Sequence, residues 1–61
     1  MFNLLEYRDY FIEVTYSPDD GGYYCFIIGR NGKDIDSTDI YKFKNNAIAR
    51  AMQIIDNLKE I

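Results

Sequence analysis

The chain has 61 residues, ten of them acidic and seven basic, which gives a net charge of −3. Residues 1–61 are long enough for one small domain. With one cysteine and no histidine, the chain excludes an intrachain disulfide and a Cys/His zinc site as sources of stability. The acidic balance disfavours nucleic acid as a partner, because nucleic-acid binders present a basic surface to phosphates. The composition favours a domain stabilised by aromatic packing, by oligomerisation or by both.

Neither a membrane span nor a secretion signal is evident in the chain. No segment approaches the roughly 18 apolar residues that a spanning helix requires. The first residues lack the basic start and the apolar stretch of a signal peptide. Cys25 lies within an apolar segment, which fits a reducing compartment where free thiols survive. The sequence therefore predicts a cytoplasmic protein without membrane contact.

The first predicted element with a clear period is a strand over residues 10–16. Residues 1–8 show no period, and they suggest either a lead-in that packs or a short strand that pairs with a sheet edge. Residues 17–22 are rich in turn formers and predict a hairpin loop. The alternation within the strand divides its side chains into a better core face and an opposite face, namely Tyr10, Ile12, Val14 and Tyr16 against Phe11, Glu13 and Thr15.

A second strand is predicted from Tyr23 to about residue 30, and its first part is unusual. Residues 23–28 are all apolar, so both faces of this strand are apolar. Residues 31–32 are Asn-Gly, which is typical of a type I′ hairpin turn. A third strand then begins near Lys33. Because residues 36–39 are polar, we expect an edge strand, with a bulge as an option, whose charges discourage further pairing.

The last predicted element is a helix that begins at Asn45 or Asn46, either of which can cap its first turn. Its apolar residues recur with a 3.6-residue period at Ile48, Ala51, Met52, Ile55 and Leu58. The predicted fold class is therefore α+β. It is a three-stranded antiparallel meander followed by one C-terminal helix packed on one sheet face, in the order β-β-β-α.

One helix covers only one face of such a sheet, so the second apolar face of residues 23–28 needs another cover. Either Tyr23, Cys25 and Ile27 or Tyr24, Phe26 and Ile28 point away from the helix, and the register between strands decides which. We expect a non-catalytic protein-binding module, a homodimer or a subunit bound to another protein. Its predicted interface residues are Phe11, Tyr24, Phe26, Ile28 and Tyr41.

Candidate chemistry is sparse, and the sequence predicts no enzyme, no cofactor and no metal. The commonest general base, histidine, is missing, and burial of Cys25 would raise its pKa and disfavour a nucleophile. Residues 34–38 begin like a calcium loop, with oxygen ligands at alternate positions. The loop's required glycine and glutamate are replaced by Asp39 and Asn45, however. No small-molecule substrate is indicated.

The alternative function is a nucleic-acid-linked regulator. The one loose group of basic residues, near the start of the helix, consists of Lys42, Lys44 and Arg50. These residues are the candidates for contact with DNA by a β-β-β-α domain. In the other form of this hypothesis, the acidic chain mimics nucleic acid and inhibits a nucleic-acid enzyme.

The stretch from Gly22 to Ile55 resembles the YegP-like family of small bacterial proteins of unknown function. The matching residues are the aromatic strand, the Asn-Gly turn and the residues leading into the helix, namely Tyr23, Tyr24, Cys25, Phe26, Asn31, Gly32, Ile35, Thr38, Tyr41, Lys42 and Lys44. The resemblance implies a β-β-β-α unit that pairs into a shared sheet by exchanging a C-terminal strand. No such strand follows the helix here, so pairing is expected without that exchange. Residues 20–23 also look like the opening hairpin of HicB-type antitoxins, although the proline-rich segment expected afterwards is missing.

Overall fold

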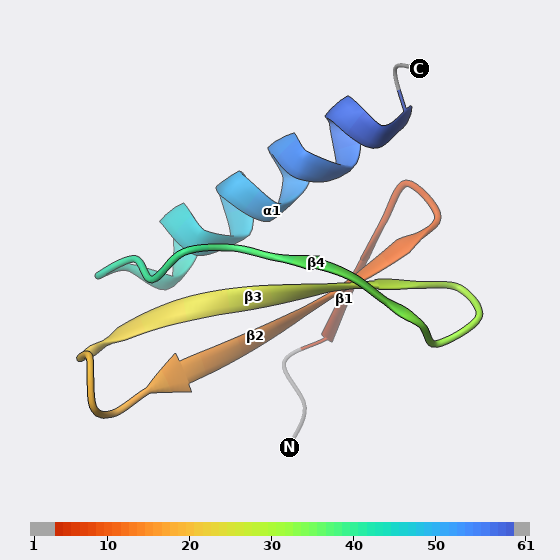
Figure 1. Cartoon of the computed structure of the whole chain (residues 1–61). Coiled ribbons are helices and arrows are strands. Elements are labelled where there is room, and N and C mark those ends of the chain that lie inside the picture. The colour runs from red at the N-terminus through yellow and green to blue at the C-terminus, as the bar shows by residue number, and fades with distance from the viewer. Residues whose placement is uncertain (1–3, 60–61) are drawn as a thin grey trace.

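The computed structural model describes residues 4–59, which form a four-stranded antiparallel sheet with one helix on one face (Figure 1). The strands follow one another in the order β1-β2-β3-β4, so the sheet is a simple meander. The elements are β1 (Leu4–Tyr7), β2 (Tyr10–Ser17), β3 (Gly22–Gly29), β4 (Asp34–Ser37) and α1 (Lys44–Lys59). The predicted α+β class and the single C-terminal helix are confirmed. The predicted count of three strands is one too few.

The additional strand is β1, which forms the edge beside β2. Leu5 is paired with Ile12, and Tyr7 is paired with Tyr10. Only Arg8 and Asp9 connect the strands, and both have positive φ angles, of 48° and 74°. A two-residue hairpin turn requires positive φ angles, and Asn-Gly is the usual pair of residues at these positions. Because Arg-Asp occupies them here, the sequence shows no turn signal. Residues 1–8 were expected to form a packed lead-in or a short strand at a sheet edge, and residues 4–7 form that strand. Residues 1–3 lie outside the described residues.

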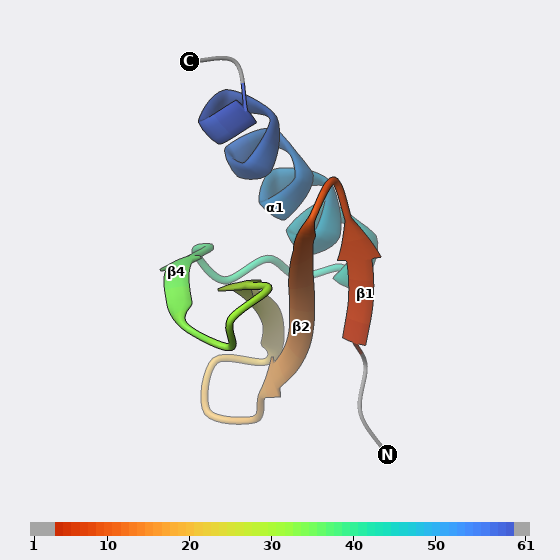
Figure 2. The same cartoon turned by 90° about the vertical axis from the view of Figure 1, so that its right-hand side faces the viewer.

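The register between β2 and β3 decides which side of the sheet becomes the core. Ile12 is paired with Ile27 and Val14 with Cys25, and all four side chains are buried. The buried residues of α1 pack against this face, as the helix lying across the sheet in Figure 2 indicates. The core cluster consists of Ile12, Val14, Cys25, Ile27, Ala47, Ala51 and Ile55. The small side chains of α1 let the helix lie close to the strands.

The helix begins one residue earlier than the first predicted position. The carbonyl oxygen of Phe43 accepts the backbone N–H of Ala47 at 3.4 Å, so Lys44 is the first helical residue. The segment between β4 and α1 continues alongside β3, antiparallel to it. There Tyr41 and Tyr23 exchange two backbone hydrogen bonds of 2.7 Å each. This pairing fixes the approach of the chain to the helix.

Strand β4 is an exposed edge, as the polar composition predicts. Its pairing with β3 shifts register between Ile27 and Ile28, which is the expected bulge. All four of its residues are exposed. The carboxylate of Asp36 accepts the backbone N–H of Ser37 at 2.8 Å. A carboxylate in that position discourages another strand from pairing with β4.

The β1–β2 turn is tied to the end of the helix by polar side chains. Asp56 accepts hydrogen bonds from the Tyr7 hydroxyl at 3.0 Å and from Arg8 Nη1 at 2.7 Å. Lys59 Nζ lies 3.2 Å from a carboxylate oxygen of Asp9. These contacts span nearly the whole sequence. They compensate for the strain of two non-glycine residues at positive φ.

This arrangement makes stability depend on pH through Asp56. The hydrogen bond from Arg8, and with it that from Tyr7, holds the pKa of Asp56 below its ordinary value, against the opposing effect of partial burial. A carboxylate whose pKa falls on folding contributes stability that is complete above its unfolded pKa, about 3.9, and is lost as pH falls through the folded pKa. We therefore expect Asp56→Asn to lower the urea midpoint at neutral pH, and the deficit to shrink below about pH 4.

The measurement is urea unfolding followed by circular dichroism at a series of pH values. Asp19→Asn provides the control, because Asp19 is an exposed carboxylate in the β2–β3 loop without a hydrogen bond or ion pair to residues 4–59. We expect this variant to follow the wild type at every pH. If the urea midpoint of Asp56→Asn stays below that of the wild type by the same amount at acidic pH, the Asp56 carboxylate is not the source of the pH dependence.

Candidate protein interface

The candidate site is the face of the sheet that points away from α1. Side chains alternate across a strand, so the residues between the core positions of β2 and β3 share this opposite face. Cross-strand pairs place Phe11 beside Ile28 and Glu13 beside Phe26. The register of β1 adds two residues of that strand. We call this surface the open face, and its members are Leu4, Glu6, Phe11, Glu13, Thr15, Tyr24, Phe26 and Ile28 on β1 to β3, with Asp34 and Ser37 on β4.

Four large apolar side chains form the centre of the open face, namely Phe11, Tyr24, Phe26 and Ile28. The rings of Tyr24 and Phe26 meet edge to face, with their centroids 5.2 Å apart. All four side chains are half-buried, whereas Ile12 and Ile27 on the helix side are fully buried. The single helix among residues 4–59 lies on the other side of the sheet. These side chains therefore retain apolar surface available to a partner.

The open face is not uniformly apolar, because it also carries the charged side chains of Glu6, Glu13, Asp34 and Arg30. The guanidinium of Arg30 lies 5.9 Å from the centre of the Phe11 ring and donates to Glu6 at 2.9 Å. Glu13 is half-buried between Leu4 and Phe26 on the flanking strands. Its carboxylate makes no hydrogen bond or ion pair with any residue of 4–59. The face thus carries a cation near one end and an unpaired anion among its apolar side chains.

The structure brings together four of the five predicted interface residues. Tyr41, the fifth, does not share the open face, because it bridges to Tyr23 and packs against the core cluster on the helix side. The sequence places it before the helix but gives no sign that the chain continues alongside β3 beyond β4. Leu4 and Glu13 were not among the predicted interface residues. The face on which Leu4 lies depends on how β1 pairs with β2, and the sequence does not indicate this pairing because it gives no signal for the Arg8–Asp9 turn.

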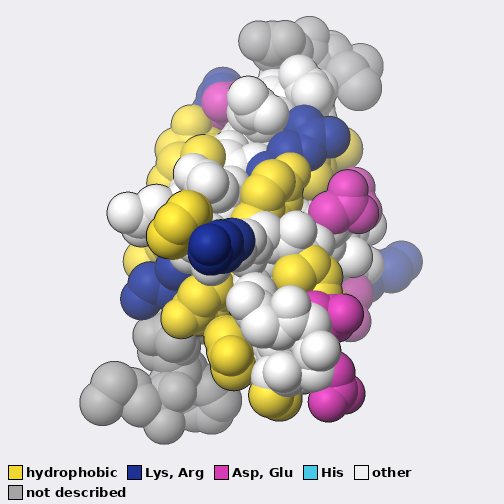
Figure 3. Space-filling model, turned by 90° about the vertical axis from the view of Figure 1, so that its left-hand side faces the viewer, with side chains coloured by type: hydrophobic (Ala, Val, Ile, Leu, Met, Phe, Trp, Pro, Cys, Tyr) yellow, Lys and Arg dark blue, Asp and Glu magenta, His cyan; other side chains and the backbone are white. Residues whose placement is uncertain are grey.

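The three basic residues of the alternative hypothesis do not form one stripe. Lys42 Nζ lies 5.7 Å from the centre of the Phe43 ring, and Arg50 donates to Gln53 at 3.2 Å. Helical residues advance by about 100°, so Lys44 and Arg50, six positions apart, point about 120° away from each other. Figure 3 shows basic side chains in several places among hydrophobic ones on that end of the molecule, with acidic side chains mostly along one side. This end lacks the continuous basic surface typical of a nucleic-acid binder.

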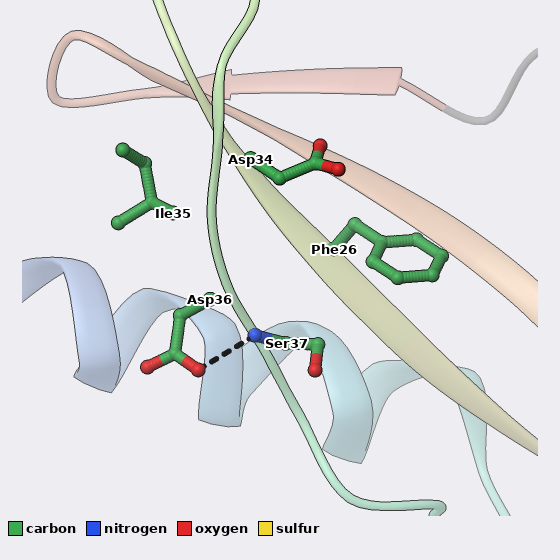
Figure 4. Close-up of a pocket in the computed structure, with 5 residues that line it drawn as sticks. All are labelled: Phe26, Asp34, Ile35, Asp36 and Ser37. Carbon is green, nitrogen blue, oxygen red and sulfur yellow. Dashed lines mark hydrogen bonds between the residues drawn. The ribbon is translucent and has the colours of Figure 1, made fainter.

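A shallow hollow of about 240 Å³ lies beside β4 (Figure 4). Phe26, Asp34, Ile35, Asp36 and Ser37 line it. Two of the three residues considered for calcium, Asp36 and Thr38, accept hydrogen bonds from the backbone. Asp36 accepts the N–H of Ser37, and the hydroxyl of Thr38 accepts the N–H of Cys25 at 3.0 Å. Within the described part of the chain, no group of three or more acidic, cysteine or histidine side chains could hold a metal ion.

The thiol of Cys25 belongs to the core and not to a reactive site. Cys25 is fully buried in β3, opposite Val14. Burial raises the pKa of this thiol, which disfavours the thiolate that a nucleophile requires. The side chain therefore acts as a small apolar group in the packing beneath α1.

Comparison with known proteins finds no family model, no curated protein and no solved structure that matches this chain. The resemblance to the YegP-like family therefore stays a prediction from the sequence. Among residues 4–59, no helix has the length and apolar character needed to cross a membrane.

Proposed function

We propose that this protein is a non-catalytic binding module that associates with protein through the open face. The observation that carries the proposal is a cluster of four apolar side chains on β2 and β3 with no layer of the described chain over it. Sheets with two apolar faces are stable when both faces are covered. Tyrosine and phenylalanine are also enriched at protein interfaces, where they bury a large area at a low entropic cost.

The small size of the domain supports the same proposal. A domain of about 60 residues buries only about 60% of its unfolded surface, and its stability is correspondingly marginal. The core consists of seven buried residues, two of which are alanines. Covering the open face would bury the apolar surface that its four half-buried side chains still expose. Association therefore contributes to stability as well as to recognition.

Phe26→Asp tests the proposal at the centre of the open face. A buried aromatic contact at the centre of an interface is worth about 2 kcal/mol or more, so we expect the dissociation constant to rise at least about 30-fold. The measurement is sedimentation equilibrium from low to high micromolar concentrations. Circular dichroism of each variant checks that it remains folded.

Phe43→Asp is the matched control for this substitution. Phe43 is a phenylalanine of 61% exposure that precedes the helix and lies outside the open face. We expect its replacement to leave self-association unchanged. A wild-type chain that stays monomeric at high micromolar concentration, or equal effects of the two substitutions, would overturn the proposal. Phe26→Thr retains a strand-forming residue and serves if the charged variant does not fold.

A further inference from the structure

We infer that the partner of the open face is a second copy of this chain, docked face to face, with Glu13 of each copy paired to Arg30 of the other. The inference rests on the proposed function and specifies its partner. It follows from three observations on the open face. These are an unpaired carboxylate, a cation in a weak ion pair and the area of the face.

The unpaired carboxylate limits which partner can cover the open face. Glu13 lies between Leu4 and Phe26 and has no polar partner among residues 4–59. An apolar partner would remove water from this carboxylate without replacing its hydrogen bonds, which is costly for a charged group. The occupant must therefore supply a cation at this position.

Arg30 is the cation that the chain itself can supply. Its guanidinium lies on the open face, over the Phe11 ring. The ion pair of Arg30 with Glu6 is exposed on both sides, with 59% of each side chain accessible. A guanidinium has five N–H donors, so Arg30 can donate to a carboxylate of the partner while it keeps its ion pairs with Glu6 and, at 4.0 Å, with Asp9. Arginine is also the basic residue most favoured at interfaces.

The positions of these two groups suit a twofold axis. Glu13 and Phe11 are two residues apart on β2, which is about 7 Å along the strand, and Arg30 lies over Phe11. Cation and anion are thus displaced from each other along the same face. A twofold axis that passes between Glu13 and Arg30 places Glu13 of one copy opposite Arg30 of the other. One contact is then made twice, as a symmetric dimer requires.

The area of the face agrees with that of a dimer interface. The two longer dimensions of the molecule are 34 and 22 Å, so one face offers at most about 750 Å². A stable interface of standard size buries about 800 Å² per partner. An interface of that size therefore needs a partner about as broad as the molecule, which favours another sheet over a narrow peptide. Two sheets packed in this way lie about 10 Å apart.

Charge exchange tests the inference. We expect Glu13→Arg and Arg30→Glu each to weaken self-association at least 10-fold, because each substitution places like charges opposite one another. The double variant, which carries both substitutions, is expected to return to within about threefold of the wild type, because the pairs re-form with reversed polarity. Sedimentation equilibrium at fixed ionic strength measures all three variants.

Two controls keep the net charge matched. Asp19→Arg and Lys33→Glu change the charge by the same amounts at exposed positions outside the open face, and we expect neither to alter association. If Phe26→Asp dissociates the protein but the double exchange restores nothing, the pairing is wrong and the proposed function stands. A wild-type chain that does not self-associate would overturn both.

Discussion

Truncation of Ile27 to alanine is expected to remove about 3–4 kcal/mol from the free energy of unfolding, because a cavity forms in a core that cannot collapse around it. Ile27 is fully buried in the centre of the sheet, with Ile12 on the neighbouring strand. A chain of this length has a total stability of only several kcal/mol. The variant should therefore be largely unfolded near physiological temperature.

Urea unfolding followed by circular dichroism measures this effect, and two further variants calibrate it. Ile27→Val removes one methylene and is expected to cost about 1 kcal/mol. Ile35→Ala truncates an isoleucine of 43% exposure on β4 and is expected to cost less than about 1 kcal/mol. Equal losses at positions 27 and 35 would show that the core does not lie beneath α1.

Gly22→Ala is expected to have the second largest effect, a loss of about 2–3 kcal/mol from overpacking. A Cβ at this position would lie 2.7 Å from the carbonyl oxygen of Tyr41 and 2.7 Å from Cγ2 of Ile40. The backbone of Tyr41 cannot easily move away, because two hydrogen bonds of 2.7 Å hold it to Tyr23. The substitution should therefore detach the segment that leads into the helix.

Gly29→Ala is the matched control at the other end of β3. There the added Cβ would lie 3.1 Å from the side-chain oxygen of Asn31, which accepts the N–H of Lys33 and needs to shift by only a few tenths of an ångström. We expect a loss below about 1 kcal/mol. Chemical unfolding compares the two variants, and hydrogen exchange of the Tyr41 amide reports local detachment. Exchange at Tyr41 that is equally slow in both variants would contradict the proposed steric conflict.

The central part of the fold follows from periodicity in the sequence. The alternation of residues 10–16 and the 3.6-residue period of the helix identify β2 and α1, and Asn31-Gly32 identifies the position of the turn before β4. The expected type I′ geometry is wrong, because Gly32 has a positive φ angle but Asn31 does not. These signals are local, because each depends on neighbouring residues. Strand β1 could not be predicted in the same way, since Arg8 and Asp9 occupy a turn that their side chains do not favour.

The open face could be predicted only in part, because β3 is apolar on both sides. Pairing of Cys25 with Val14 and of Ile27 with Ile12 directs Tyr24, Phe26 and Ile28 away from the helix. That choice depends on the register between strands, which a doubly apolar pattern does not encode. The isolation of Glu13 is likewise a property of three strands together, so no motif could reveal it.

Because Asp56 on α1 contacts Tyr7 and Arg8, the two ends of the described chain are expected to unfold together. The Arg8–Asp9 turn is conformationally disfavoured, and it is compensated by contacts with the last turns of α1. Strand β1 is therefore expected to dock late in folding, after the helix has formed, and to be released when the end of the helix frays. Because Leu4 of β1 belongs to the open face, fraying on one side of the sheet would alter the surface on the other.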